Sequence, residues 1–244
     1  MASRSVRSVK PRPSGIAARK TSRRAGRSRL SRGEIETLFS RLAKKLPEPK
    51  GELEYVNPYT LLVAVVLSAQ STDVGVNKAT RVLFAKANTP QKMLKLGLAE
   101  LVQAIRSLGF FNMKARNVMA LSRILVEEHG GEVPREREAL QRLPGVGRKT
   151  ASVVLNIAFK QPVIAVDTHI FRVANRTGLA PGATADEVAD LLEKVVPDAY
   201  RLHAHHWLIL HGRYVCVARK PKCPECVISD VCKYKDKTRP AGGV

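Results

Sequence analysis

Residues 143–150 read Leu-Pro-Gly-Val-Gly-Arg-Lys-Thr, and this stretch joins two segments with helical spacing. A helix is expected to end near Arg142, and a new helix is expected to begin near Arg148. The two glycines between them, Gly145 and Gly147, let the backbone adopt positive φ angles and approach a ligand closely. The free N–H groups of such a turn and of the next helix start form a site for an anion such as a phosphate. An ordinary corner between two helices has the same pattern and stays an alternative at this point.

The rest of the chain shows the same helical periodicity on both sides of this turn. Residues 61–67 are apolar on every side, which predicts a helix inside a bundle. No alternating run bounded by hairpin turns is present, so the predicted fold class is all-α, with about ten helices and short loops. The expected helices span residues 34–46, 58–67, 74–87, 90–95, 98–107, 112–129, 136–142, a segment from 148 onward, 168–176, 184–195 and about 198–212.

The charge of the chain indicates a polyanionic partner. The 244 residues include 42 Lys+Arg and 21 Asp+Glu, a formal net charge of +21, while 44% of the residues are hydrophobic, as in a globular protein. Nucleic acid and an acidic membrane surface are the two candidate partners. The longest purely apolar run has seven residues, residues 61–67, and a spanning helix needs roughly 20. The sequence therefore favours nucleic acid.

The N-terminal segment is expected to be a basic arm without a fold of its own. Residues 1–32 contain 11 lysines and arginines and no acid, and they show no apolar periodicity. We place the boundary of this arm at residues 1–30. Three roles stay open for it: solubility, non-specific affinity for DNA, and import into an organelle. The protein is expected to act in the cytoplasm, at the bacterial nucleoid. If the source is eukaryotic, import into mitochondria or the nucleus is the alternative.

Two residues are candidates for catalysis. Lys149 lies in the first turn of a predicted helix, where the macrodipole disfavours its positive charge and the amine is expected to release its proton more easily. A neutral amine is a nucleophile suited to Schiff-base chemistry, although a phosphate-binding lysine fits the position equally well. Asp167, with Thr168, begins another helix and is a good N-cap. Beside a DNA-binding cleft, the same carboxylate can stabilise a developing cation or activate a nucleophile.

The four cysteines follow a metal-binding pattern. Cys216, Cys223, Cys226 and Cys232 lie within 17 residues, with one short C-x₂-C pair flanked by single cysteines. Structural zinc sites usually combine two short pairs, whereas this spacing suits a four-iron cluster bound by four thiolates. An iron–sulfur cluster is therefore favoured over zinc, and disulfides are third. The histidines around residues 207–210 are interpreted as packing or hydrogen-bonding residues of a partly buried helix rather than as metal ligands.

Taken together, these motifs resemble the endonuclease III family of the HhH-GPD superfamily of DNA glycosylases. Residues 143–150 look like the family's helix-hairpin-helix, Asp167 follows Lys149 at the family's distance, and the cysteine spacing matches the family's iron–sulfur loop. Residues 67–73 and 206–213 also look like endonuclease III segments. The resemblance covers about residues 30–238.

The resemblance implies two helical lobes. A six-helix barrel would span residues 52–162 and contain the helix-hairpin-helix at about 140–158. The second lobe would combine residues 31–51 with 163–240 and bind one [4Fe-4S] cluster per chain through the four cysteines. The active site would lie between the lobes.

It also implies an activity and residue roles. The enzyme would act as a monomer on damaged double-stranded DNA, with no small-molecule cosubstrate beyond water, and would remove oxidised or ring-saturated pyrimidines. Lys149 would attack C1′, expel the base and form a Schiff base, Asp167 would assist, and β-elimination would cut the strand 3′ to the lesion. The residues implied in DNA binding are Gln70, which would fill the gap left by the flipped base, Phe110 and Asn112, which would wedge against the opposite strand, and Gly145, Gly147 and Arg148 at the hairpin.

Two other hypotheses stay open beside the bifunctional glycosylase and lyase. One is a glycosylase of the same fold with another base preference or without the lyase step. The other is a non-catalytic module that uses the hairpin and the cluster only to bind DNA. The lysine at position 149 favours the bifunctional branch, because adenine-specific relatives lack it.

Overall fold

The computed structural model describes residues 26–239, which form eleven α-helices, one short 3₁₀ turn and no strand. This confirms the predicted all-α class, and the predicted helix boundaries lie within two residues of the observed ones. No helix in this part of the chain combines the length and the apolar character that a membrane span requires. The helices are α1 (Arg32–Lys45), α2 (Pro58–Leu67), α3 (Asp73–Lys86), α4 (Pro90–Leu96), α5 (Leu98–Ile105), α6 (Phe111–His129), α7 (Arg137–Gln141), α8 (Arg148–Phe159), α9 (Thr168–Thr177), α10 (Ala185–Val195) and α11 (Asp198–Tyr214), with the 3₁₀ turn at Cys223–Glu225.

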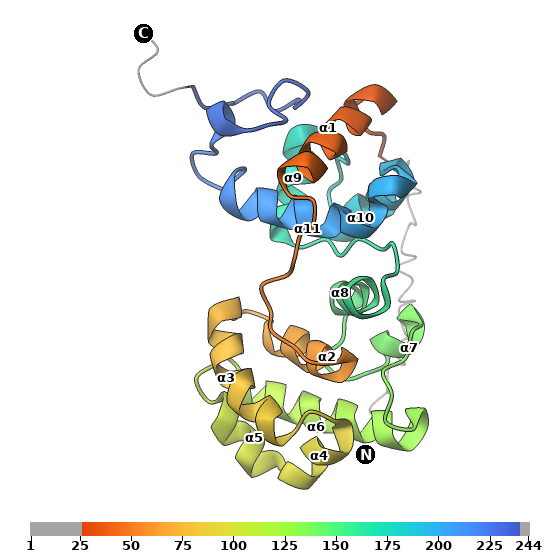
Figure 1. Ribbon diagram of the computed structural model, residues 1–244, viewed down its shortest axis with the longest axis vertical. Coiled ribbons are helices and arrows are strands. Elements are labelled where there is room, and N and C mark those ends of the chain that lie inside the picture. The colour runs from red at the N-terminus through yellow and green to blue at the C-terminus, as the bar shows by residue number, and fades with distance from the viewer. Residues whose placement is uncertain (1–25, 240–244) are drawn as a thin grey trace, which may run out of the picture.

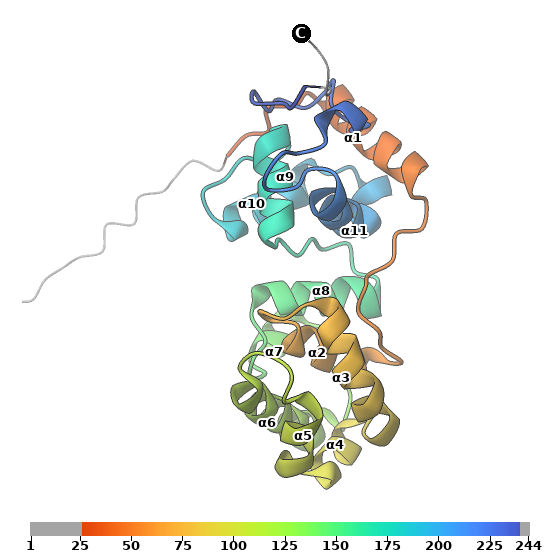
Figure 2. The ribbon, with the colours of Figure 1, turned by 90° about the vertical axis from the view of Figure 1, so that its left-hand side faces the viewer.

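The helices form two lobes (Figures 1 and 2). One lobe contains α2–α8, and its core draws on residues between Tyr59 and Leu155. The other contains α1 and α9–α11, and its core combines residues from Leu30 to Leu42 with residues from Ile164 to Ile228. The chain therefore passes between the lobes twice, once between α1 and α2 and once between α8 and α9.

Helix α2 lies at the centre of the first lobe. Asn57 caps it, because its side chain accepts a hydrogen bond from the Thr60 N–H at 2.8 Å, and Pro58 occupies the first helical position, where the missing N–H costs nothing. Every residue from Tyr59 to Leu67 is buried, as the sequence predicts. The helix has no exposed face because α3, α6 and α8 pack around it.

The helix-hairpin-helix consists of α7, a six-residue turn and α8. Gly145 has a φ of 81°, and a Cβ there would lie 2.9 Å from Nδ2 of Asn117, so this position requires glycine. Gly147 is different: its φ of −89° is open to any residue, and the expected positive φ is wrong at this position. A Cβ on Gly147 would meet nothing within 4 Å, so the start of α8 is open to a partner.

The second lobe packs α1 against α11. The rings of Phe39 and Tyr200 stack with centroids 5.7 Å apart, and the indole N–H of Trp207 donates to the carbonyl of Leu46 at 2.8 Å. The predicted arm at residues 1–30 lies outside the described residues except for its last five. Of these, Arg29 donates its backbone N–H to the carbonyl of Gly178 at 2.8 Å, and Leu30 is buried in the core of this lobe.

Candidate active site

Lys149 is the second residue of α8 and is exposed at the surface of a cleft between the lobes. The helix begins at Gly147 without a side-chain cap, so no acceptor from a capping side chain pairs with the N–H groups of its first turn. These N–H groups and the helix dipole favour an anion at this end of α8. The start of α8 therefore combines an anion-binding backbone with a primary amine.

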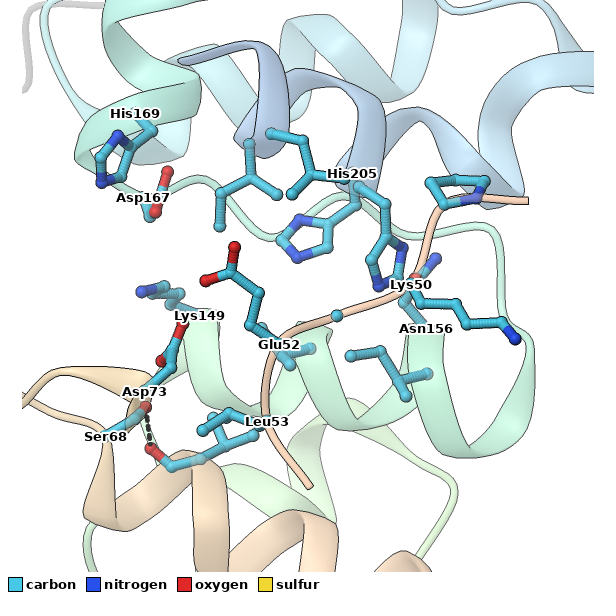
Figure 3. Close-up of a pocket in the computed structure, with 18 of the residues that line it drawn as sticks. Lys50, Glu52, Leu53, Ser68, Asp73, Lys149, Asn156, Asp167, His169 and His205 are labelled. Atoms are coloured by element: carbon cyan, nitrogen blue, oxygen red, sulfur yellow. Dashed lines mark hydrogen bonds between the residues drawn. The ribbon is translucent and has the colours of Figure 1, made fainter. Parts of the chain in front are cut away.

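Asp167 lies on the other side of the same cleft, at the start of α9 in the second lobe. Its carboxylate accepts a hydrogen bond from the N–H of Ile170 at 2.8 Å, so it caps the helix as the sequence predicts. The residue is half-buried and lines the cleft together with Lys149. Figure 3 shows the two side chains at the same edge of this pocket, each coming from its own lobe. The structure therefore brings the two predicted catalytic residues to one cavity.

The cleft has a volume of about 900 Å³, within the range of about 300–1,000 Å³ that is usual for ligand sites. Much of its wall is apolar, and several residues that sequence reasoning did not select also line it. These residues are Glu52, Asp73, His205 and Arg213 (Figure 3 labels the first three). Asp73 and Arg213 occur in residues 67–73 and 206–213, the two segments that resemble the family. That resemblance is the sequence feature that could have identified them as site residues. Glu52 lies in the segment that connects the lobes and had no such signal.

Arg213 joins the two lobes beside the cleft. Its guanidinium donates to Asp73 at 2.6 Å and also to Glu52, which in turn accepts from the hydroxyl of Tyr214. Arg213 comes from α11, Asp73 from α3 and Glu52 from the connecting segment. Both carboxylates therefore share the single positive charge of Arg213.

Arg148, predicted to bind DNA, contacts acidic residues of α10. Its guanidinium lies 3.2 Å from Asp186 and also pairs with Asp190, and this pairing raises its pKa. These ion pairs connect the start of α8 with the second lobe. In this structure Arg148 is thus a contact between lobes.

Of the other predicted DNA contacts, Gln70 and Phe110 lie on two neighbouring loops of the first lobe, and Asn112 lies in the first turn of α6. Gln70 and Phe110 are exposed, and both adopt left-handed backbone conformations, with φ angles of 52° and 57°. A Cβ on Gly109 would lie 3.6 Å from the carbonyl oxygen of Gln70, so the loops are adjacent. Lys114 is buried beneath them and donates to the hydroxyl of Ser71 at 2.8 Å, while Asn112 is exposed. Two strained loops thus project together from one surface.

The four cysteines line one small cavity next to Thr177 and Ile228. Burial, together with the neighbouring thiolates, raises the pKa of Cys226 and Cys232, so four bare thiolates are unfavourable here without positive charge between them. Within residues 26–239, no three His, Cys, Asp or Glu side chains converge closely enough for a single metal ion. Four thiols around one cavity, more widely spaced than the ligands of one ion, fit a cluster of several irons better than zinc.

Two side chains point at the cysteine sulfurs. His211 Nε2 lies 3.6 Å from Cys226 Sγ, and a guanidinium N–H of Arg176 donates to Cys216 Sγ at 3.7 Å. Such contacts stabilise metal-bound thiolates. The remaining histidines around residues 207–210 make packing or hydrogen-bonding contacts, as predicted: the ring of His203 lies 5.5 Å from that of Trp207, and Nδ1 of His205 lies 3.0 Å from the carbonyl oxygen of Ala165.

Comparison with known proteins agrees with this geometry. Residues 63–198 match the HhH-GPD superfamily of base excision DNA repair proteins, and residues 216–232 match the iron–sulfur binding domain of endonuclease III. The chain is 57% identical over 200 residues to endonuclease III of Haemophilus influenzae and 56% identical to that of Escherichia coli K12, covering 82% of this chain and 95% of each relative.

Solved structures give the same result. A trapped covalent intermediate of endonuclease III with DNA superposes with a TM-score of 0.78 at 45% identity, covering 84% of this chain and 96% of that one. A thermostable thymine-DNA glycosylase superposes with a TM-score of 0.72 at 28% identity, covering 82% and 94%. The chain binds DNA and an iron–sulfur cluster of the [4Fe-4S] type, and it belongs to the endonuclease III family of DNA glycosylases and AP lyases within the HhH-GPD superfamily.

Proposed function

We propose that the protein removes oxidised or ring-saturated pyrimidines from duplex DNA and then cuts the strand 3′ to the abasic site, with Lys149 as nucleophile and Asp167 as its carboxylate partner. One observation carries this proposal. The amine at the start of α8 and the carboxylate at the start of α9 come from different lobes and line the same cleft of about 900 Å³. A nucleotide extruded from the duplex would lie between them.

The proposed reaction begins at C1′ of the extruded nucleotide. The amine nitrogen of Lys149 attacks this carbon while the bond from C1′ to the base breaks, and the base leaves with the electron pair and takes up a proton. The nitrogen releases one proton, which balances the proton taken up by the base. The bond from C1′ to the ring oxygen then breaks, the remaining proton of the nitrogen moves to that oxygen, and an imine forms between the nitrogen and C1′. Loss of a C2′ proton then expels the 3′ phosphate, and water hydrolyses the imine to regenerate the lysine. The carboxylate of Asp167 stabilises the positive charge that develops on the sugar.

DNA would bind across the mouth of the cleft. The N–H groups at Gly145 and Gly147 and at the start of α8 bind phosphate in this proposal, which the open surroundings of Gly147 and the uncapped start of α8 support. Gln70 fills the gap left by the extruded base, and Phe110 and Asn112 contact the opposite strand. The exposure of Gln70 and Phe110 on two adjacent loops, and of Asn112 at the start of α6, supports these roles. Arg148 would bind phosphate by exchanging its contacts with Asp186 and Asp190 for a DNA oxygen.

We propose the domain division 52–162 for the helix-hairpin-helix lobe and 31–51 with 163–240 for the cluster lobe, with one helical barrel in the former. The six longer helices of the first lobe, α2–α6 and α8, and its separate core support this division. Cys216, Cys223, Cys226 and Cys232 would bind the cluster, which crosslinks the loop after α11 and supplies no step of the reaction.

The partner we propose is damaged duplex DNA bound by a monomer, with water as the other reactant. The bacterial origin of the relatives favours the chromosome in the cytoplasm as the place of action.

Borohydride trapping on abasic-site DNA tests the proposal. Wild type is expected to form a covalent complex, and Lys149→Ala is expected to form none while still binding the DNA. Lys160→Ala is the matched control, because Lys160 lines the same cleft at the other end of α8. Normal trapping by Lys149→Ala would show that the nucleophile is another residue. Failure of wild type to trap would favour a glycosylase without lyase activity or a binding module, and excision of a lesion base would separate these two.

A further inference from the structure

One buried imidazole lines the cleft and takes no part in the steps above. His205, on α11, has 4% of its surface exposed, and its Nδ1 lies 3.0 Å from the backbone carbonyl oxygen of Ala165. Figure 3 shows its ring directed into the pocket, on the side away from Lys50. A fixed polar ring inside a ligand cavity is the type of group that orients a ligand.

The hydrogen bond determines which ring nitrogen bears the proton. A carbonyl oxygen only accepts, so Nδ1 donates. Burial above all, and then the charge of His206, lowers the pKa of His205 to about 3, while Asp167 at the start of α9 opposes this and Lys149 at the start of α8 adds to it. The ring is therefore neutral near pH 7, and Nε2 has a free lone pair. Among the described residues Nε2 has no hydrogen-bond partner, and it is not enclosed as the orphaned Nδ1 of His206 is.

Much of the wall of this cleft is apolar, with Leu61, Val65, Val153, Val166 and Ile209 from both lobes among its residues, and the carboxylate of Glu52 also lines it (Figure 3). In a largely apolar cleft a fixed acceptor discriminates between ligands, because a ligand without a matching donor leaves a desolvated lone pair unpaired.

We propose that Nε2 of His205 accepts a hydrogen bond from the N3–H of the extruded base, so that the cleft favours uracil- and thymine-type lesions over cytosine-type lesions. The inference rests on the proposed function and names the part of the lesion that the site reads. Uracil-type rings carry a hydrogen on N3, whereas cytosine-type rings present a lone pair there. Two lone pairs facing one another repel, and no proton is available between them.

Two variants of His205 separate reading of the base from support of the fold. His205→Asn places its amide N–H near the position of Nδ1, so it keeps the donor to Ala165 and removes the acceptor at Nε2. His205→Gln places its amide near the position of Nε2, so it keeps an acceptor in the cleft and loses the donor to Ala165. His206→Asn is the control, because it changes a neighbouring buried histidine that lines the same cleft toward Gly51.

The experiment compares 5-hydroxyuracil with 5-hydroxycytosine in duplexes of one sequence, since the two bases differ at position 4 and in the proton on N3. Single-turnover excision is measured for each variant, and strand cleavage at a preformed abasic site is measured in parallel. His205→Asn is expected to lower excision of 5-hydroxyuracil by about threefold to tenfold, the effect of one neutral hydrogen bond, and to lower excision of 5-hydroxycytosine less. His205→Gln is expected to keep more of the preference for 5-hydroxyuracil, and His206→Asn is expected to leave the ratio unchanged.

Cleavage of the preformed abasic site distinguishes the possible failures. This substrate has no base, so the reading role predicts wild-type cleavage in His205→Asn. A parallel loss of cleavage would mean that His205 positions Lys149 instead, and the proposal would be wrong. It would also be wrong if both bases were affected equally, or if His205→Gln were the weaker variant in every assay, as a purely structural role predicts. If wild type cleaved no abasic site, the proposed function itself would fail.

Discussion

Asp167 has two roles in the structure that a single substitution can separate. Its carboxylate caps α9 through the N–H of Ile170, and the same group lines the cleft opposite Lys149. A capping aspartate is common, so the cap alone would not single this residue out. Because the same carboxylate of Asp167 both caps α9 and lines the cleft, a substitution there can change the stability of α9 as well as the proposed reaction.

We predict that Asp167→Asn lowers base excision on the order of 10²–10⁴-fold with little change in the thermal unfolding midpoint, since asparagine caps helices about as well as aspartate. Asp167→Ala is expected to lose excision to a similar extent and also to lower the midpoint by about 2–4 °C, the effect of roughly 1 kcal/mol. Single-turnover excision and thermal unfolding measure the two effects. Excision that followed the midpoint in both variants would assign Asp167 a capping role alone.

Local spacing predicts some residues of the cleft and not others. Lys149 and Asp167 are each marked by a helix start, and the cysteines by their spacing. Glu52 and His205 carry no such mark, because they reach the cleft only through contacts between segments far apart in the sequence. At Gly147 the local pattern misleads: its place in a Gly-x-Gly pair predicts a positive φ, but the residue has a φ of −89°.

At the scale of elements, helical periodicity predicts where helices lie but not which ones form a lobe. The wholly apolar residues 61–67 correctly predict a central helix, since no other position buries every face. The sequences of α1 and α2 do not by themselves predict that these helices belong to different lobes. That prediction depends on the resemblance to the family.

Helix α11 is expected to make stability depend on pH. Burial lowers the pKa of His205 to about 3 and that of His206 to about 4, the latter also through the charges of His203 and Lys160. In the unfolded chain these rings take up protons near pH 6.5, so the unfolded state binds more protons and stability falls as the pH drops. We predict a loss of about 2–4 kcal/mol in the free energy of unfolding between pH 7 and pH 5 from the two residues together.

Thermal unfolding of wild type and His206→Asn at several pH values measures this effect, with absorbance near 400 nm recorded to confirm that the cluster is retained. The variant is expected to lose less stability than wild type on acidification, because the contribution of His206 is absent while those of the other buried histidines remain. Glu34, whose pKa is lowered to about 2 by its contact with Lys233, contributes stability that is lost only below about pH 4.5, outside this window. Identical profiles for the two proteins would contradict the prediction.

At the scale of the whole molecule, the net positive charge indicates a nucleic-acid partner, but the structure does not show which lysines and arginines bind it. Eight of the 42 lysines and arginines lie in residues 1–25, outside the described residues. Within the described part, Arg148, Arg137 and Arg213 pair with acidic residues of the opposite lobe. The net charge therefore does not by itself identify the residues that contact phosphate.

Deletion of residues 1–25 is predicted to weaken DNA binding and to make log K fall less steeply with log salt, by about 0.9 for each phosphate contact that is lost. Replacement of the same residues by an equally long Gly/Ser segment is the matched control and is expected to behave like the deletion. Titrations from 50 mM to 200 mM salt give the slope. If the slope of log K against log salt were unchanged by the deletion, the arm would have no role in DNA binding, and the solubility role would be favoured.

The second core, which combines residues from Leu30 to Leu42 with residues from Ile164 to Ile228, sets an order of events during synthesis. Helix α1 leaves the ribosome first, yet its partner α11 follows more than 150 residues later. The core of the lobe formed by α2–α8 comes from one continuous stretch of chain, so this lobe is able to fold during translation. Helix α1 has no such local partner, and its apolar face stays uncovered until α11 is made. Loading of iron and sulfide onto all four cysteines consequently follows the synthesis of Cys232, and a nascent chain stalled before that residue would expose α1 to chaperones and proteases.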